Sequence, residues 1–127
     1  MDPKRKIVLL VDDDVDVIEQ MKIAIEKEYN VMIAGSGEEA LEKLAETKPD
    51  CIVLDVMMSH LSDGLDITKK IKENNATKDI PIIMLTGVNQ YYDYSTQVEE
   101  GYFPYDKWLN KPIKSEKLLE EIKSLIK

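Results

Sequence analysis

The chain has 127 residues, 43% hydrophobic and 33% charged, which suits one globular domain with one core. Its 25 acidic and 17 basic residues give a net charge of −8, which argues against direct nucleic-acid binding and favours a cation as partner. A single cysteine excludes an internal disulfide and a cysteine-based metal site. Since no apolar stretch is long enough for a signal peptide or a membrane span, we expect a cytoplasmic protein without a membrane partner.

Short apolar runs alternate with helical patterns along the whole chain. In chain order we predict a strand at 7–11, a helix at 14–28, a strand at 31–34, a helix from Ser36 to near Pro49, a strand at 51–54, a helix at 64–73, a strand at 80–85, a helix at 89–100, a weaker edge strand at 107–110 and a last helix from Ser115. Runs of consecutive apolar residues are typical of parallel strands covered on both faces. The alternation predicts an α/β fold with a parallel sheet and no second domain.

Two of the predicted helices carry start signals. The stretch "SGEE" at 36–39 is a capping box, in which the Ser36 side chain accepts from the backbone three residues on and Glu39 reaches back. Ser115 is the predicted cap of the last helix.

Polar residues directly follow four of the five apolar runs. Because the carboxyl ends of parallel strands meet at one edge of a sheet, we expect these residues to lie together although they are far apart in sequence. The set is Asp12, Asp13, Asp55, Thr86 and Lys111.

This combination of side chains suits phosphoryl transfer to a carboxylate. Neighbouring carboxylates repel one another, and a divalent cation relieves that cost. Oxygen ligands without histidine or cysteine favour Mg²⁺. An aspartate can act as the nucleophile that forms an acyl phosphate, while a lysine and a hydroxyl bind phosphoryl oxygens.

The segments "IVLLVDDD", "PDCIVLDVMM", "IPIIMLTG" and "NKPI" resemble the receiver domains of two-component response regulators, in the same order and over the whole chain. The resemblance implies one receiver domain over 1–127, with a flavodoxin-like, doubly wound (βα)5 fold and a five-stranded parallel sheet of order 2-1-3-4-5. It also implies the site. Asp55 would be the phosphoacceptor, Asp12 and Asp13 would hold Mg²⁺ with the Met57 backbone carbonyl, Lys111 would contact the phosphoryl group, and Thr86 would be the switch hydroxyl.

The resemblance further implies the partners and the output face. The phosphoryl donor would be a phosphohistidine on a sensor histidine kinase or a histidine phosphotransfer protein, and the chain would catalyse only its own phosphorylation and dephosphorylation. The signal would pass to a downstream protein or an attached output domain. The switch aromatic would be Trp108, and Tyr91, Tyr94 and Tyr105 would lie on the face that the family uses for output.

The loop after Asp55 departs from the family pattern. Ser59 stands where the family usually has proline, and the Asp63-Gly64 pair comes one residue late. We therefore expect 59–64 to form a longer loop that lacks the stiffening proline ring.

Two other functions remain open on the residues alone. A haloacid-dehalogenase-type phosphatase also uses an aspartate nucleophile and Mg²⁺, but it normally carries a second aspartate two residues later, where this chain has Met57. A pseudo-receiver would be a binding module with a dead site, against which the complete set of five polar residues argues. The sequence also leaves open whether the chain is a stand-alone regulator or part of a longer one.

Overall fold

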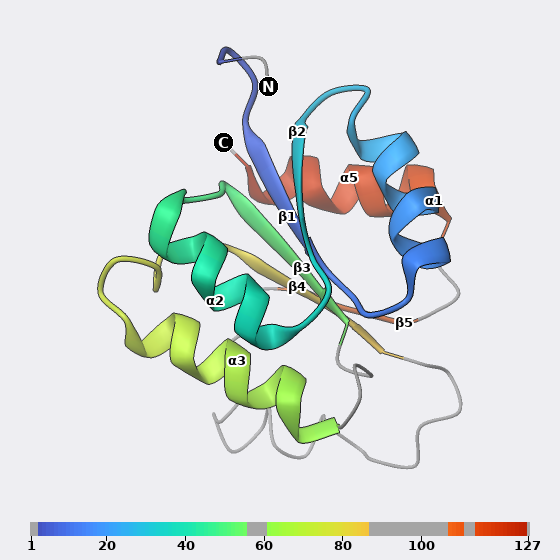
Figure 1. The fold of residues 1–127 in the computed structure, drawn as a ribbon. Helices are drawn as coiled ribbons and strands as arrows, with labels where there is room; N and C mark the ends of the chain where they lie inside the picture. The colour runs from blue at the N-terminus through green and yellow to red at the C-terminus, as the bar shows by residue number, and fades with distance from the viewer. Residues whose placement is uncertain (1–2, 56–60, 87–106, 111–113, 127) are drawn as a thin grey trace.

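A parallel sheet with helices on both faces forms the molecule (Figure 1). The computed structural model describes residues 3–55, 61–86, 107–110 and 114–126, with the backbone alone described at 61–66, 86, 108 and 110. The strands are β1 (Ile7–Val11), β2 (Asn30–Ala34), β3 (Cys51–Asp55), β4 (Ile82–Thr86) and β5 (Lys107–Asn110), in the order β2-β1-β3-β4-β5. The described helices are α1 (Val15–Ile25), α2 (Gly37–Glu46), α3 (Leu61–Glu73) and α5 (Ser115–Leu125). The predicted flavodoxin-like parallel sheet is confirmed.

Each face of the sheet carries its own hydrophobic core. The first core joins alternate strand residues, such as Leu9 and Ile52, to α2 and α3. The second joins the intervening residues, such as Val8 and Val53, to α1 and α5. Because both faces are covered, every position of β3 is buried, which explains why the strand sequences do not alternate with polar residues.

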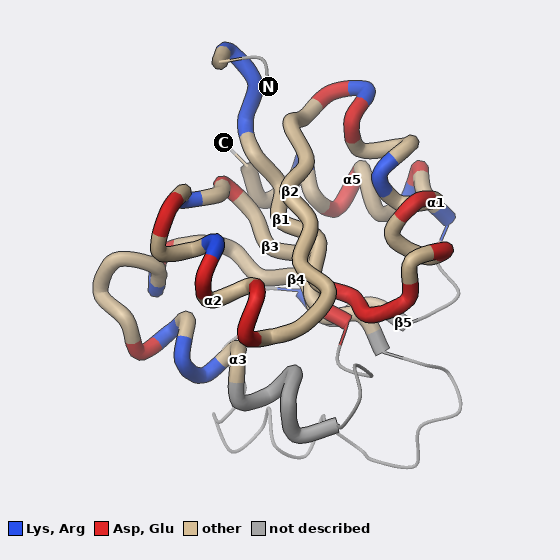
Figure 2. The backbone as a smooth tube through the Cα atoms, viewed as in Figure 1, with Lys and Arg blue, Asp and Glu red and all other residues tan. Residues whose placement is uncertain are grey.

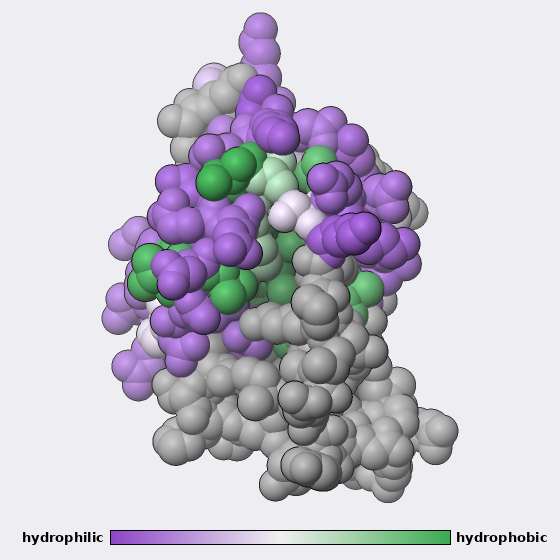
Figure 3. Space-filling view, turned by 90° about the vertical axis from the view of Figure 1, so that its right-hand side faces the viewer, coloured by the Kyte–Doolittle hydropathy of each residue, from purple (hydrophilic) through white to green (hydrophobic). Residues whose placement is uncertain are grey.

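The surface is mostly polar where it is described. On the side shown in Figure 3, hydrophobic residues appear as separate patches among hydrophilic ones. Among the described residues, none of the helices is both long and apolar enough to cross a bilayer.

Two predicted helix starts need correction. The structure begins α3 at Leu61, so residues 61–64 of the predicted 59–64 loop are helical. Ser115 is the first helical residue of α5 rather than its cap, because Lys114 occupies the cap position and makes no side-chain cap bond. The predicted helix at 89–100 lies outside the described residues.

The start of α2 agrees with the predicted capping box. The Ser36 hydroxyl accepts a hydrogen bond from the backbone N–H of Glu39 at 3.1 Å. The Glu39 carboxylate reaches back and accepts from the N–H of Gly35 at 3.0 Å. The two bonds fix the direction in which the chain leaves β2 and enters α2.

Gly37, the first residue of α2, lies directly against α3. A Cβ at this position would overlap Cγ1 of Ile67 and lie 2.6 Å from its Cδ1. Ile67 is buried and β-branched, so its side chain has little freedom to move aside. The close packing of α2 on α3 therefore depends on glycine here.

We predict that Gly37→Ala lowers the free energy of unfolding by about 1–3 kcal/mol, the range typical of overpacking. Alanine is otherwise the better helix former, so a loss would report the overlap with Ile67. The matched control is Gly35→Ala, whose Cβ would meet its nearest neighbour, a Glu39 oxygen, at an ordinary 3.6 Å. Urea unfolding of both variants measures the difference, and equal stability would contradict the packing argument.

Candidate functional site

Three of the predicted site residues meet at the carboxyl ends of two neighbouring strands. Asp12 and Asp13 follow β1, and Asp55 is the last residue of β3. These strands are parallel neighbours, with Val11 paired to Leu54, so their ends lie side by side. One carboxylate oxygen from each of the three aspartates lies within 4.8 Å of the others. The proximity expected from the strand ends is therefore observed for these three residues.

The cluster combines buried and exposed carboxylates. Asp12 is fully buried and Asp55 is 4% exposed, whereas Asp13 is exposed. Figure 2 shows acidic segments at this end of the sheet. Burying carboxylates side by side is costly unless hydrogen bonds or a counter-charge compensate. The sheet register brings the three carboxylates together in a cluster that could hold a cation.

Asp12 is held by the backbone on both sides. Its N–H donates to the carbonyl of Ala34 at 3.1 Å, and its Oδ1 accepts from the N–H of Asp14 at 2.9 Å. The second bond is an Asx turn, which a run of three aspartates is able to form but which was not predicted from the sequence. Asp14 in turn caps α1, with its Oδ1 accepting from Asp16 and Val17. The Asp12 carboxylate is thus positioned before any ligand arrives.

The donor set fits a hard divalent cation. Three carboxylates supply oxygen atoms alone, and their spacing allows one ion to contact an oxygen of each. Oxygen ligands of this kind suit Mg²⁺, Ca²⁺ or Mn²⁺ more than softer metals. An ion at this point would offset the mutual repulsion of the carboxylates.

Thr86 ends β4 on the same edge of the sheet. Asp55 pairs with Leu85, and Thr86, the next residue, pairs with Asn110 of β5. The backbone of Thr86 is therefore one position from the strand pair that contains Asp55.

Trp108 is the second residue of β5, and its backbone pairs with Met84. The other predicted residues, Met57, Lys111, Tyr91, Tyr94 and Tyr105, lie outside the described residues.

Ion pairs attach α5 to the rest of the molecule. Glu121 lies 3.2 Å from both Lys107 of β5 and Lys117, and these two cations, Lys107 first, hold the pKa of its carboxyl below the usual value. Lys123 lies 2.8 Å from Glu28, which raises the pKa of the lysine. α5 is thereby linked to β5 on one side and to the turn after α1 on the other.

Comparisons with known proteins identify the family. Residues 8–123 match the family model of the response regulator receiver domain. The chain is 32% identical over 123 residues to the alkaline phosphatase synthesis transcriptional regulatory protein PhoP of Bacillus subtilis, covering 96% of this chain and 49% of that protein. The chain belongs to the response regulator receiver domain family.

Solved structures agree with this assignment. Chemotaxis response regulator CheY4 of Vibrio cholerae superimposes with a TM-score of 0.82 at 27% identity, covering 96% of this chain and 99% of that one. The receiver domain of a histidine kinase from Syntrophus aciditrophicus superimposes with a TM-score of 0.83 at 30% identity, covering 95% and 89%. The chain spans about half the length of the curated relatives it matches.

We predict that Asp13→Asn stabilises the protein in EDTA by on the order of 1 kcal/mol, because it removes one charge from the cluster. The same substitution should reduce the additional stability that Mg²⁺ confers, since a ligand that binds only the folded state stabilises it. Urea unfolding in EDTA and in Mg²⁺ measures both effects.

The control for this prediction is Asp79→Asn, which removes an equal charge from an exposed position outside the cluster. If the two variants responded identically in both buffers, the three carboxylates would not be acting as a cation site.

Proposed function

We propose that residues 1–127 form one receiver domain that accepts a phosphoryl group on Asp55 in the presence of Mg²⁺. The observation that carries the proposal is the cluster of Asp12, Asp13 and Asp55, two of them buried, at the strand ends of a chain that belongs to this family. Asp55 is the nucleophile because it is the β3 terminus of that cluster and lies in the segment that resembles the family's phosphoacceptor motif.

In the proposed step a carboxylate oxygen of Asp55 attacks the phosphorus atom of a phosphohistidine. The new O–P bond forms as the P–N bond to the imidazole breaks, and the imidazole nitrogen keeps the electron pair and takes up a proton. Asp12, Asp13, Asp55 and the Met57 carbonyl would hold Mg²⁺, which supplies positive charge beside the transferring group.

The remaining residues bind the transferred group. The Lys111 ammonium contacts one phosphoryl oxygen and the Thr86 hydroxyl binds another. The hydrogen bond from the Asp14 N–H holds the Asp12 carboxylate in its place in the cluster during the transfer. The strand register, in which Thr86 follows the partner of Asp55, supports the role of Thr86. The position of Lys111 in the sequence directly after β5 supports the role of Lys111.

Phosphorylation of Asp55 adds charge at the site, and this added charge changes the surface of the domain. Thr86 moves toward the phosphoryl group, and Trp108 follows it, altering the face that includes Tyr91, Tyr94 and Tyr105. The direct pairing of β4 with β5 joins the strand that ends at Thr86 to the strand that contains Trp108, which supports this route. One modification thereby biases a two-state element.

The donor is a sensor histidine kinase or a histidine phosphotransfer protein, and the domain acts in the cytoplasm. Beyond self-phosphorylation and dephosphorylation it performs no catalysis. Its output passes to a downstream protein or to an attached domain, which the doubled length of the curated relatives supports. The net charge of −8 argues that any contact with nucleic acid is made by another domain or protein.

Two other functions fit the residues less well. A pseudo-receiver would not require three converging carboxylates. A haloacid-dehalogenase-type phosphatase would require an acid where Met57 stands.

We predict that incubation with acetyl phosphate and Mg²⁺ adds a single phosphoryl group, measured by intact mass. The adduct should be absent in Asp55→Asn, which lacks the nucleophile, and in EDTA, which removes the cation. The matched control is Asp14→Asn, which makes the same change of charge next to the cluster and retains a good helix cap.

Other outcomes would assign the chain differently. Sustained hydrolysis of phosphate esters would favour the phosphatase, and the lack of any adduct with every donor tried would favour the pseudo-receiver. An adduct that survives in Asp55→Asn would mean that a different residue is the acceptor.

A further inference from the structure

β2 is the edge strand beside β1, and within the described part of the chain no strand pairs with its other side. Two hydrogen bonds fix which residues face β1: the N–H of Asn30 donates to Lys6 at 2.8 Å, and the carbonyl of Ala34 accepts from Asp12 at 3.1 Å. In a parallel ladder alternate residues bond to the same neighbour, so Val31 and Ile33 turn their backbone groups away from the sheet.

The sequence of β2 offers little protection against strand addition. The strand reads "NVMIA" and contains neither a charged residue nor proline, the usual means by which an edge is blunted. Its three central residues are only partly buried. An apolar edge of this kind is a template for another strand.

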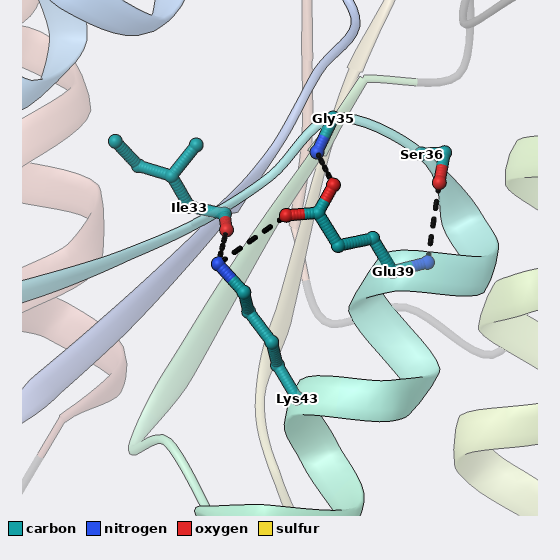
Figure 4. A network of polar contacts seen from close by, with 5 residues as sticks. All are labelled: Ile33, Gly35, Ser36, Glu39 and Lys43. Carbon is teal, nitrogen blue, oxygen red and sulfur yellow. Dashed lines mark hydrogen bonds and ion pairs between the residues drawn. The ribbon is translucent and has the colours of Figure 1, made fainter.

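Two side chains from α2 occupy the outward groups at the end of this edge (Figure 4). Lys43 Nζ donates to the carbonyl of Ile33, and Oε2 of Glu39 accepts from the N–H of Gly35 at 3.0 Å. The other oxygen of Glu39 lies 3.4 Å from Lys43 Nζ, so the pair is one connected unit.

The pattern of these bonds matches that of a neighbouring strand. In a parallel ladder, a residue of the added strand donates to the carbonyl of residue i and accepts from the N–H of residue i+2. Lys43 donates to Ile33 and Glu39 accepts from Gly35, which are positions i and i+2. An incoming strand would have to displace this ion pair to continue the ladder.

We propose that the Glu39–Lys43 pair acts as a substitute strand that keeps the β2 edge from pairing with a second copy of this chain. The second copy is the occupant to exclude because it presents an identical edge, and two such edges can join about a twofold axis. In such an antiparallel pairing the carbonyl of Ile33 would accept a hydrogen bond from the second copy, and Lys43 already donates to that carbonyl.

The electrostatics of Glu39 fit this role. The N–H of Gly35, followed by Lys43, holds the pKa of the Glu39 carboxyl below its usual value. The shift favours the ionised carboxylate, which is the form that accepts from Gly35 and pairs with Lys43. Ser36 accepts from the backbone N–H of Glu39, which fixes the first turn of α2 on which the carboxylate sits.

The test compares self-association of the unmodified chain with that of Lys43→Met and of the double variant Glu39→Ala, Lys43→Met. Methionine keeps the aliphatic length and the helix propensity of lysine but donates no hydrogen bond. By sedimentation velocity without a phosphoryl donor, we expect the dissociation constant for the dimer to fall at least about tenfold in the variants. In the associated form the amides of Val31 and Ile33 should gain protection from hydrogen exchange.

The matched control removes a different pair of the same type. Lys69 and Glu73 lie 4.0 Å apart on α3, with 72% and 65% of their side chains exposed, and Lys69→Met with Glu73→Ala makes the same chemical change away from the edge. This variant should associate no more than the unmodified chain. Because the experiment uses no phosphoryl donor, its result is independent of the role proposed for Asp55.

Three results would overturn the proposal. The first is that Lys43→Met remains monomeric over the same concentrations as the unmodified chain. The second is association in which the amides of Val31 and Ile33 stay unprotected, since the contact would then use another surface. The third is equal association of the α3 control. If circular dichroism shows that the double variant loses its fold, the single variant Lys43→Met decides the outcome.

Discussion

The repulsion among Asp12, Asp13 and Asp55 is the constraint on which the site depends. The carboxylates meet because β1 and β3 are parallel neighbours in a sheet covered on both faces, and Asp12 and Asp55 are buried at the ends of these strands. The hydrophobic free energy of two cores therefore maintains an arrangement that electrostatics alone opposes. A site held in this way favours a cation and whatever anionic group the cation can accept.

The aspartate cluster was predictable from the sequence because each of its signals is local. The aspartates come at the ends of uninterrupted apolar runs, and the carboxyl ends of parallel strands meet at one edge of the sheet. Helix starts were less predictable. Leu61 opens α3 inside a stretch with serine, aspartate and glycine, residues that usually indicate a loop, and Lys114 precedes α5 without a side-chain bond that would identify it as the cap.

Contacts between elements far apart in sequence are not encoded by any local pattern. The capping box correctly predicted that Glu39 reaches back, because both partners lie within four residues. That Lys43 would reach the carbonyl of Ile33 depends on how α2 crosses β2, which no local pattern encodes. The need for glycine at position 37 likewise follows from the position of Ile67 on a helix distant in sequence.

The end of β2 links the site to the protected edge. The carbonyl of Ala34 faces inward and accepts from Asp12, while Ile33 and Gly35 on either side face outward and bond to α2. A strand added at the outer side would displace the Glu39–Lys43 pair from the residues on either side of Ala34. The bond that positions Asp12 and the two bonds to α2 therefore fall on three consecutive residues, with Ala34 between Ile33 and Gly35.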